Sequence, residues 1–238
     1  MTGHALLNAD AHRDLRVRTG RAADLGDAVM SCLVVPWEFR QVQNDYPILF
    51  QLNQERDSFT AVALFGFEAG ENLFLSDAGW EARSVPLAMA IQPFLIGGAP
   101  DGTGDKKVHV DTASPRIGGG EGMRVFDEAG QATPYLEAVI ERLDLLDQGY
   151  RASGDFFAAL RRNALLEPLT LEITLDNGST NRLVGFHTID EERLQALDPA
   201  TLGELHSAGH LMPIFMALAS LSNIAKLVER KNRSLGHG

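Results

Sequence analysis

The chain has 238 residues, and its 21 Lys and Arg against 32 Asp and Glu give a formal net charge of -11. This charge repels a phosphate backbone, so the sequence predicts no nucleic-acid partner. The length suffices for a sizeable core without a metal or a disulfide, and the single cysteine, Cys32, lies in an apolar run that predicts a buried, inert thiol.

The N-terminal residues lack the basic start and continuous apolar segment of a secretory signal. A lone cysteine suits a reducing compartment, so we expect a cytoplasmic protein. The longest apolar segment, residues 211–228, is interrupted by Pro213, Asn223 and Lys226. Its apolar positions recur at helical spacing, which predicts one helix facing a core and no membrane span.

The first half of the chain has the pattern of short strands. Residues 64–80, "LFGFEAGENLFLSDAGW", predict strand, turn, strand and turn. The glycine-rich segment 96–107 predicts a mobile loop before a strand at 108–110, and residues 118–122 form a second glycine cluster. Other apolar pieces separated by turn-forming residues lie at 33–35, 48–52 and 61–67.

Helices dominate the second half. Thr133 and Pro134 predict an N-cap and a first-turn proline, for a helix that we expect to end at Gly149. A second helix is expected over 153–165.

Beyond these helices, alternating residues 169–175 and the Asn177-Gly178 turn predict a hairpin. Thr188 with Glu191 predicts a capping box, and Asp198-Pro199 opens a further helix. Strands therefore cluster early and one hairpin returns late, without the alternation of a parallel sheet. The predicted fold class is α+β, a mainly antiparallel sheet with helices packed on one side and a helix-rich C-terminal half, in a single domain over 1–238.

One short pattern suggests a metal. His109 and Asp111 leave the same face of a predicted strand, and with a distant His187 or His206 they would supply the three ligands of an iron(II) oxygenase. A strand histidine near a loop is more often a surface or hydrogen-bonded residue. His206 and His210 have zinc-ligand spacing, but Gly209 between them predicts the end of a helix.

Two tryptophans, Trp37 and Trp80, lie at strand or turn edges beside Glu38 and Glu81. They suit core packing with a satisfied indole N–H. The alternative is a recognition surface for a peptide or protein, because aromatic side chains provide large contact areas.

Several motifs occur in a familiar order between residues 12 and 228. The sequence resembles the bacterial SapC family, which is named after a protein linked to surface layers. The segments that carry the resemblance are "HRDLRV", "VVPWEF", "YPILF", "LFGFEAGENLFL", "GWEARSVPLAMAIQPF", "FDEAGQATPYLEAV", "GFHTIDEERLQAL" and "LHSAGHLMPIFMALASLSNIAKL".

The resemblance implies a cytoplasmic protein, encoded near halogenase-like flavoproteins, cupin-like proteins and TonB-dependent receptors. This setting suggests a pathway that handles peptides or proteins. Two departures from the family pattern matter. Residues 88–94 lack the basic pair and the aromatic residue that often precede Pro-Phe, and His109 is unusual for the family whereas Asp111 is typical.

These observations predict an accessory or binding protein without a cofactor. We expect its hairpin tips to engage a peptide or protein partner and a helical surface near 211–228 to join a homodimer. The alternative is an iron-dependent oxygenase acting on a peptide side chain, and a small-molecule carrier is a third possibility. The expected partner-binding residues are Glu68, Asn72, Trp80 and Pro86, and the alternative iron ligands are His109, Asp111, His187 and His206.

Overall fold

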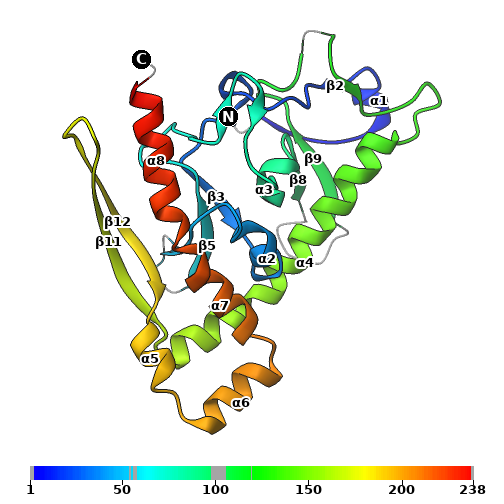
Figure 1. The fold of residues 1–238 in the computed structure, drawn as a ribbon. Coiled ribbons are helices and arrows are strands. Elements are labelled where there is room, and N and C mark those ends of the chain that lie inside the picture. Colours follow the sequence, from blue (N-terminus) through cyan, green and yellow to red (C-terminus); the bar gives the residue numbers. More distant parts are fainter. Residues whose placement is uncertain (1–2, 54, 56–57, 98–105, 119, 237–238) are drawn as a thin grey trace. The chain divides into compact units, whose positions relative to one another are not determined.

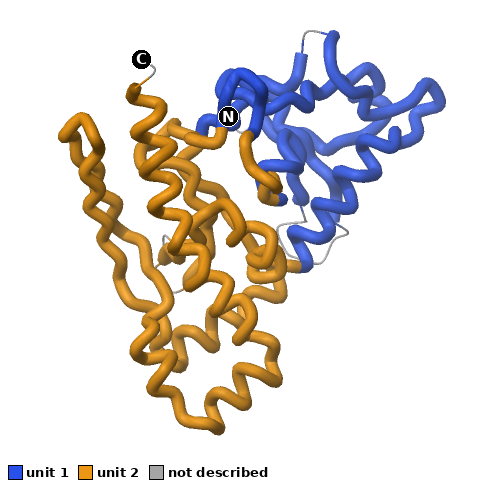
Figure 2. The backbone as a smooth tube through the Cα atoms, viewed as in Figure 1, with its two compact units in different colours: residues 1–28, 75–80, 87–148 blue, residues 29–74, 81–86, 149–238 orange. Residues whose placement is uncertain are grey.

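The structure is a computed structural model that describes residues 3–53, 55, 58–97, 106–118 and 120–236. Its contacts divide the chain into two compact units that interleave in sequence (Figure 2). Unit 1 contains residues 1–28, 75–80 and 87–148, and unit 2 contains residues 29–74, 81–86 and 149–238. The expectation of a single domain stays a prediction, and each unit is described by itself.

Unit 2 contains a five-stranded sheet in which every neighbouring pair is antiparallel (Figure 1). The strand order is β11-β12-β4-β5-β3. Strands β4 and β5 are mostly apolar, because consecutive residues facing both sides of the sheet are buried. The strands are β3 (Ser31–Val34), β4 (Ile48–Leu52), β5 (Phe59–Leu64), β11 (Leu166–Thr174) and β12 (Thr180–Ile189).

The late hairpin β11–β12 forms as predicted. Gly178 at its turn has a φ of +84°, a conformation that glycine adopts without strain. Strand β12 pairs with β4 only at Phe186 and His187. The outer part of the hairpin therefore extends past the rest of the sheet as a two-stranded ribbon (Figure 1).

Short helices complete unit 2. Asp198 caps α6 as predicted, but the cap of α5 is Asp190, whose Oδ1 accepts from the Arg193 N–H at 2.8 Å. The expected cap, Thr188, is instead a buried residue of β12. The elements are η2 (Pro36–Glu38), α2 (Phe39–Val42), α5 (Glu191–Gln195), α6 (Pro199–Ser207), α7 (Leu211–Ser220) and α8 (Asn223–Gly236).

The single helix predicted over 211–228 is two helices, α7 and α8. Two buried polar side chains at their junction, Ser220 and Asn223, bond to backbone groups of neighbouring segments. The Ser220 hydroxyl accepts from the Ile48 N–H at 2.8 Å and donates to the Ala217 carbonyl at 2.5 Å. Buried Asn223 donates to the Gln43 carbonyl at 2.8 Å. This junction therefore fixes both helices against the start of β4.

Taken together, residues 211–236 are long and apolar enough to cross a membrane by length and composition, and 28% of their most apolar window is buried. This is weak evidence, because core helices of soluble proteins pass the same test. The absence of a membrane span stays a prediction.

Unit 1 is built from smaller antiparallel pieces. Its three-stranded sheet has the order β1-β9-β8, and β2 pairs with β10 while β6 pairs with β7. The core of the glycine-rich segment predicted as a loop, residues 98–105, lies outside the described residues. The elements are β1 (His4–Leu6), α1 (Ala9–His12), β2 (Arg16–Val17), η1 (Ala23–Leu25), β6 (Leu75–Ser76), β7 (Gly79–Trp80), α3 (Leu87–Ala90), β8 (Phe94–Gly97), β9 (Lys107–Asp111) and β10 (Met123–Arg124).

A buried ion cluster holds the loops of unit 1. Arg116 Nη2 lies 2.6 Å from Asp27 Oδ1, and both residues are almost fully buried. Arg116 also donates to the carbonyls of Arg18 and Gly20, and Arg21 donates to Asp27 and to the Met89 carbonyl. Because each charge is paired and hydrogen-bonded, burial is tolerated.

The segment 64–80 differs from the predicted hairpin. Strand β5 ends at Leu64 and pairs with β3 and β4, so residues 72–75 do not form its partner strand. The chain turns at 68–71, and a separate short hairpin, β6–β7, follows. The prediction failed because the apolar stretch 65–67 is buried without pairing as a regular strand.

Helix α4 (Pro134–Arg162) starts after Thr133 as predicted but does not end at Gly149. A Cβ atom at Gly149 would lie 2.7 Å from Cγ2 of buried Val35. The glycine is therefore a contact point inside one long helix, where the backbone comes close to Val35. The two helices expected over 133–165 are one, which begins in unit 1 and ends in unit 2.

The same substitution at two glycines of α4 tests this contact. Gly149→Leu should lower the free energy of unfolding by about 1–3 kcal/mol, because the added atoms overpack against Val35. Gly154→Leu should leave it unchanged or raise it by up to about 1 kcal/mol, because that site is open and leucine favours a helix. Urea denaturation measures both. Equal effects would contradict the assigned contact.

Candidate partner-binding groove

The segment from Val35 to Phe39 places the side chain of Trp37 outside the core. Val35 and Phe39 are buried, and so is Glu38, whose Oε1 accepts from the Val35 N–H at 3.1 Å. Pro36 begins the 3-10 turn η2 between them. Since the residues on both sides are fixed inward, Trp37 points outward, and its side chain is 60% exposed.

Helix α4 provides the floor beside Trp37. Ala152 and Phe156 line the surface there, and Phe156 also belongs to a buried aromatic cluster. Its ring centre lies 6.2 Å from that of Phe39 in an edge-to-face contact. Phe39 in turn contacts Phe50 at 6.5 Å. The floor is therefore rigid, because it is part of a packed core.

The turn between α6 and α7 forms the opposite wall. Gly209 has a φ of +74° and ends α6, as predicted. The His210 N–H then donates to the Leu205 carbonyl at 2.8 Å. The His210 ring packs against Phe156, with ring centres 5.6 Å apart. Residues from this wall that line the groove are Ala208, Gly209, His210, Met212, Pro213 and Met216.

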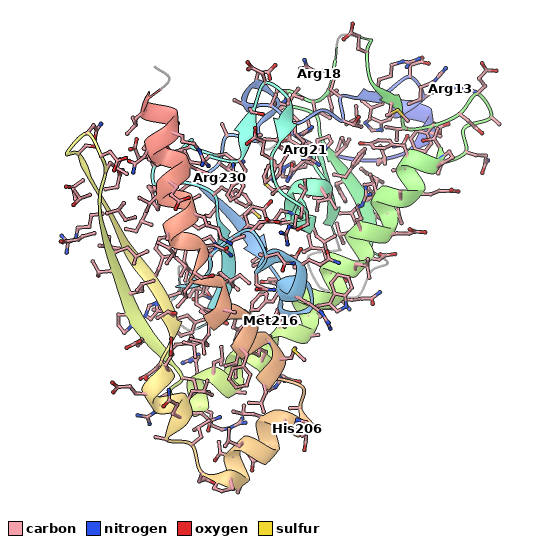
Figure 3. All side chains as sticks on the ribbon, viewed as in Figure 1. Arg13, Arg18, Arg21, His206, Met216 and Arg230 are labelled. Atoms are coloured by element: carbon pink, nitrogen blue, oxygen red, sulfur yellow. The ribbon has the colours of Figure 1, made fainter. Side chains whose placement is uncertain are left out.

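The Trp37 segment, helix α4 and the turn between α6 and α7 together form a groove of about 360 Å³, called the Trp37 groove below. Met212 in its lining is 57% exposed. Met216 lies on the same helix, α7 (Figure 3). The described residues that line the groove include no Asp or Glu, and Arg40 supplies their one guanidinium group. The groove is thus apolar and aromatic with one cationic edge, the composition typical of a binding site for an apolar anchor.

Burial lowers the pKa of His210, which lines the groove. The charge of Asp155 raises the pKa and that of Arg162 lowers it, but both effects are smaller than burial. His210 is therefore neutral at pH 7, and the groove gains no second positive charge at that pH.

A second hollow of about 420 Å³ adjoins the groove and shares His210 and Ala208 with it. It is lined by α4 and α6 and contains Asp155, Arg162 and Glu204. We call it the acidic hollow, because its two carboxylates outnumber its one guanidinium.

The partner-binding residues expected from the sequence lie elsewhere. Glu68 is mostly exposed, and it accepts from Lys231 at 3.1 Å and from Asn181 at 2.8 Å. Asn72 accepts from the Phe74 N–H at 3.0 Å, and Pro86 is buried. Trp80 is half-buried on β7 and belongs to unit 1, whereas the other three belong to unit 2.

Lys231 joins this loop to α8. It is buried and forms ion pairs with Glu68 and Glu71, and the Glu71 carboxylate also accepts from the Phe67 N–H at 2.8 Å. Burial opposes protonation of Lys231, but the two carboxylates together raise its pKa. The hydrogen bonds of these charged groups therefore hold the loop internally.

The residues expected as alternative iron ligands do not come together in one site. His109 lies on β9 over Gly97, where an added Cβ would come within 2.6 Å of its Nε2, and Asp111 Oδ1 accepts from the Ala113 N–H at 3.0 Å. The His187 ring packs on Phe59, with ring centres 5.0 Å apart, and His206 is exposed near the end of α6. Within the described part of the chain, no three His, Cys, Asp or Glu side chains form a group that could hold a metal.

Cys32 is half-buried on β3. Burial, and to a lesser extent the charge of Glu38, raises the pKa of its thiol well above the ordinary value. The thiol is therefore protonated at neutral pH, as expected for an inert cysteine.

The comparison with known proteins concerns nearly the whole chain. The family model described as SapC matches residues 7–227. The chain belongs to the SapC family. No match was found to a curated protein or to a solved structure. The matched range includes every residue of the Trp37 groove, so the groove lies within the SapC-family part of the chain.

The expected partner-binding residues include none of the groove. Trp37 stands at a turn edge and was weighed as a recognition residue, but core packing was preferred for it, whereas it is exposed. Met212 and Met216 were assigned to a core-facing helix, whereas Met212 and the neighbouring Phe215 are largely exposed. Residues 211–219 contain no charge and are apolar on every face, a pattern that predicts a helix buried all round. The sequence therefore gives no signal that Met212 and Phe215 are exposed.

The His210 ring can be followed by NMR during a pH titration. Its pKa should lie below the ordinary value of about 6.5, lower still in Asp155→Asn and higher in Arg162→Gln. Because the unfolded chain then binds the proton first, the free energy of unfolding should fall as the pH drops from about 6.5 to the folded pKa. An increase of the pKa in Asp155→Asn would contradict the assigned surroundings.

Proposed function

We propose that this SapC-family protein is an accessory protein that binds a segment of a peptide or protein partner in the Trp37 groove. The observation that carries this proposal is the 60% exposed tryptophan held over a packed aromatic floor. Tryptophan is among the residues that contribute most to binding energy at protein interfaces. Its fixed position also means that little conformational freedom is lost on binding.

The walls of the groove suit a partner side chain. Met212 and Met216 have flexible, polarisable side chains that adapt to irregular apolar shapes. Phe156 and Pro36 on the other side are fixed by the core and by the η2 turn. An anchor side chain can therefore insert between a rigid wall and an adaptable one.

The groove is a better candidate surface than the loop around Glu68 and Asn72. The polar groups of that loop already bond to Lys231, Asn181 and the Phe74 backbone. A partner would have to displace those bonds, whereas the apolar groove exchanges only water. The proposal also includes the cytoplasmic location that we expect for this chain, and a role in a pathway with halogenase-like flavoproteins and TonB-dependent receptors.

A selection of random 12-residue peptides on the purified chain tests the groove. Peptides selected on the wild type should bind Trp37→Ala at least tenfold more weakly, because the anchor loses its largest contact. Tyr150→Ala is the matched control, since Tyr150 is also a largely exposed aromatic residue but does not line the groove.

Circular dichroism should show that both variants keep the wild-type fold. Selected peptides that bind both variants as tightly as the wild type would overturn the groove as the binding site.

A further inference from the structure

The charges around the Trp37 groove indicate what kind of segment it takes. We infer that the partner segment has an apolar anchor between two opposite charges, with a carboxylate beside Arg40 and a cation beside the acidic hollow. This inference rests on the proposed function and adds the chemistry of the ligand to it.

Arg40 supplies the positive end. It is exposed on α2 at the edge of the groove, and within the described residues no side chain forms an ion pair or hydrogen bond with its guanidinium. Arginine binds a carboxylate through two parallel hydrogen bonds. In a chain with a net charge of -11, a groove without a lining carboxylate is a local departure from the average surface.

The acidic hollow supplies the negative end. Asp155 and Glu204 are exposed there and, in the described part of the chain, form no ion pair, whereas Arg162 contributes one opposing charge. His210 separates this hollow from the groove and is neutral at pH 7. The surface therefore changes sign from Arg40, across an apolar centre, to Asp155 and Glu204.

The shape of the site favours a short segment over a second copy of this chain. The groove is concave, so it suits a protruding segment better than another concave copy. Its volume of about 360 Å³ is in the range of pockets that hold one small ligand or anchor group.

Four labelled peptides test the inference by fluorescence anisotropy. Each has a central Phe in a Ser-Ala background, flanked by Glu on both sides, by Lys on both sides, or by one of each in either order. One of the two mixed orders should bind at least fivefold more tightly than either uniformly charged peptide. If only net charge mattered, the peptide with two Lys would bind best, because the chain is acidic.

Two charge reversals show which end binds which flank. Arg40→Glu should shift the preference to the peptide with two Lys, and Glu204→Lys should shift it to the peptide with two Glu. Arg182→Glu and Glu172→Lys are the matched controls, because these residues form an exposed pair 3.7 Å apart on the β11–β12 hairpin. The controls should leave the order of affinities unchanged.

The outcomes separate the two proposals. In one outcome, the affinities follow the net charge of the peptides, neither charge reversal changes their order, and binding is lost in Trp37→Ala. That outcome would overturn the two-charge ligand and leave the groove as the binding site. Failure of all four peptides to bind would overturn both. A wild-type dimer in sedimentation that Trp37→Ala dissociates would overturn the peptide in favour of a second copy.

Discussion

The contact between Gly149 and Val35 is the constraint on which the rest of unit 2 depends. With no side chain at Gly149, the α4 backbone comes close enough to Val35 for its following turns to pack on the sheet. Phe157 then contacts the ring of Phe50 directly. Phe156 contacts Phe39, which in turn contacts Phe50. The same contact fixes the residue that precedes η2. One missing side chain thus positions both the floor of the Trp37 groove and the tryptophan above it.

The groove joins two kinds of surface that differ in mobility. Its floor is part of a core in which aromatic rings interlock, so it resists deformation. Its α7 side includes methionine side chains, whose rotatable bonds allow several shapes. A partner side chain bound as we propose would be held by the first surface and accommodated by the second. Such a site would discriminate little between anchors of similar size, and its selectivity would come mainly from the charges around it.

The sequence was sufficient to predict structure where residues close together in the chain determine it. The Asn177-Gly178 hairpin, the Asp198 cap and the Thr133-Pro134 helix start follow from residues close in sequence, and the SapC motifs gave the family. Gly149 was misinterpreted because its role depends on Val35, more than 100 residues away in the chain. The groove could not be predicted for the same reason: its walls come from segments near residues 37, 154 and 211, which only tertiary packing brings together.

The ribbon formed by the outer part of β11–β12 has a further consequence for behaviour at high concentration. A two-stranded ribbon leaves unpaired backbone groups along its edges, to which another chain could add as an extra strand. Pro168 removes one donor from the edge of β11, but only in the inner part of the hairpin, where it pairs with His187. In the ribbon, the Glu172–Arg182 pair places charges across the two strands. Exposed Val184 on β12 is the weak point of this protection. Charge is therefore the main feature that disfavours addition of a strand to this hairpin. Because concentrated salt screens exposed charges, it should favour edge-to-edge assembly.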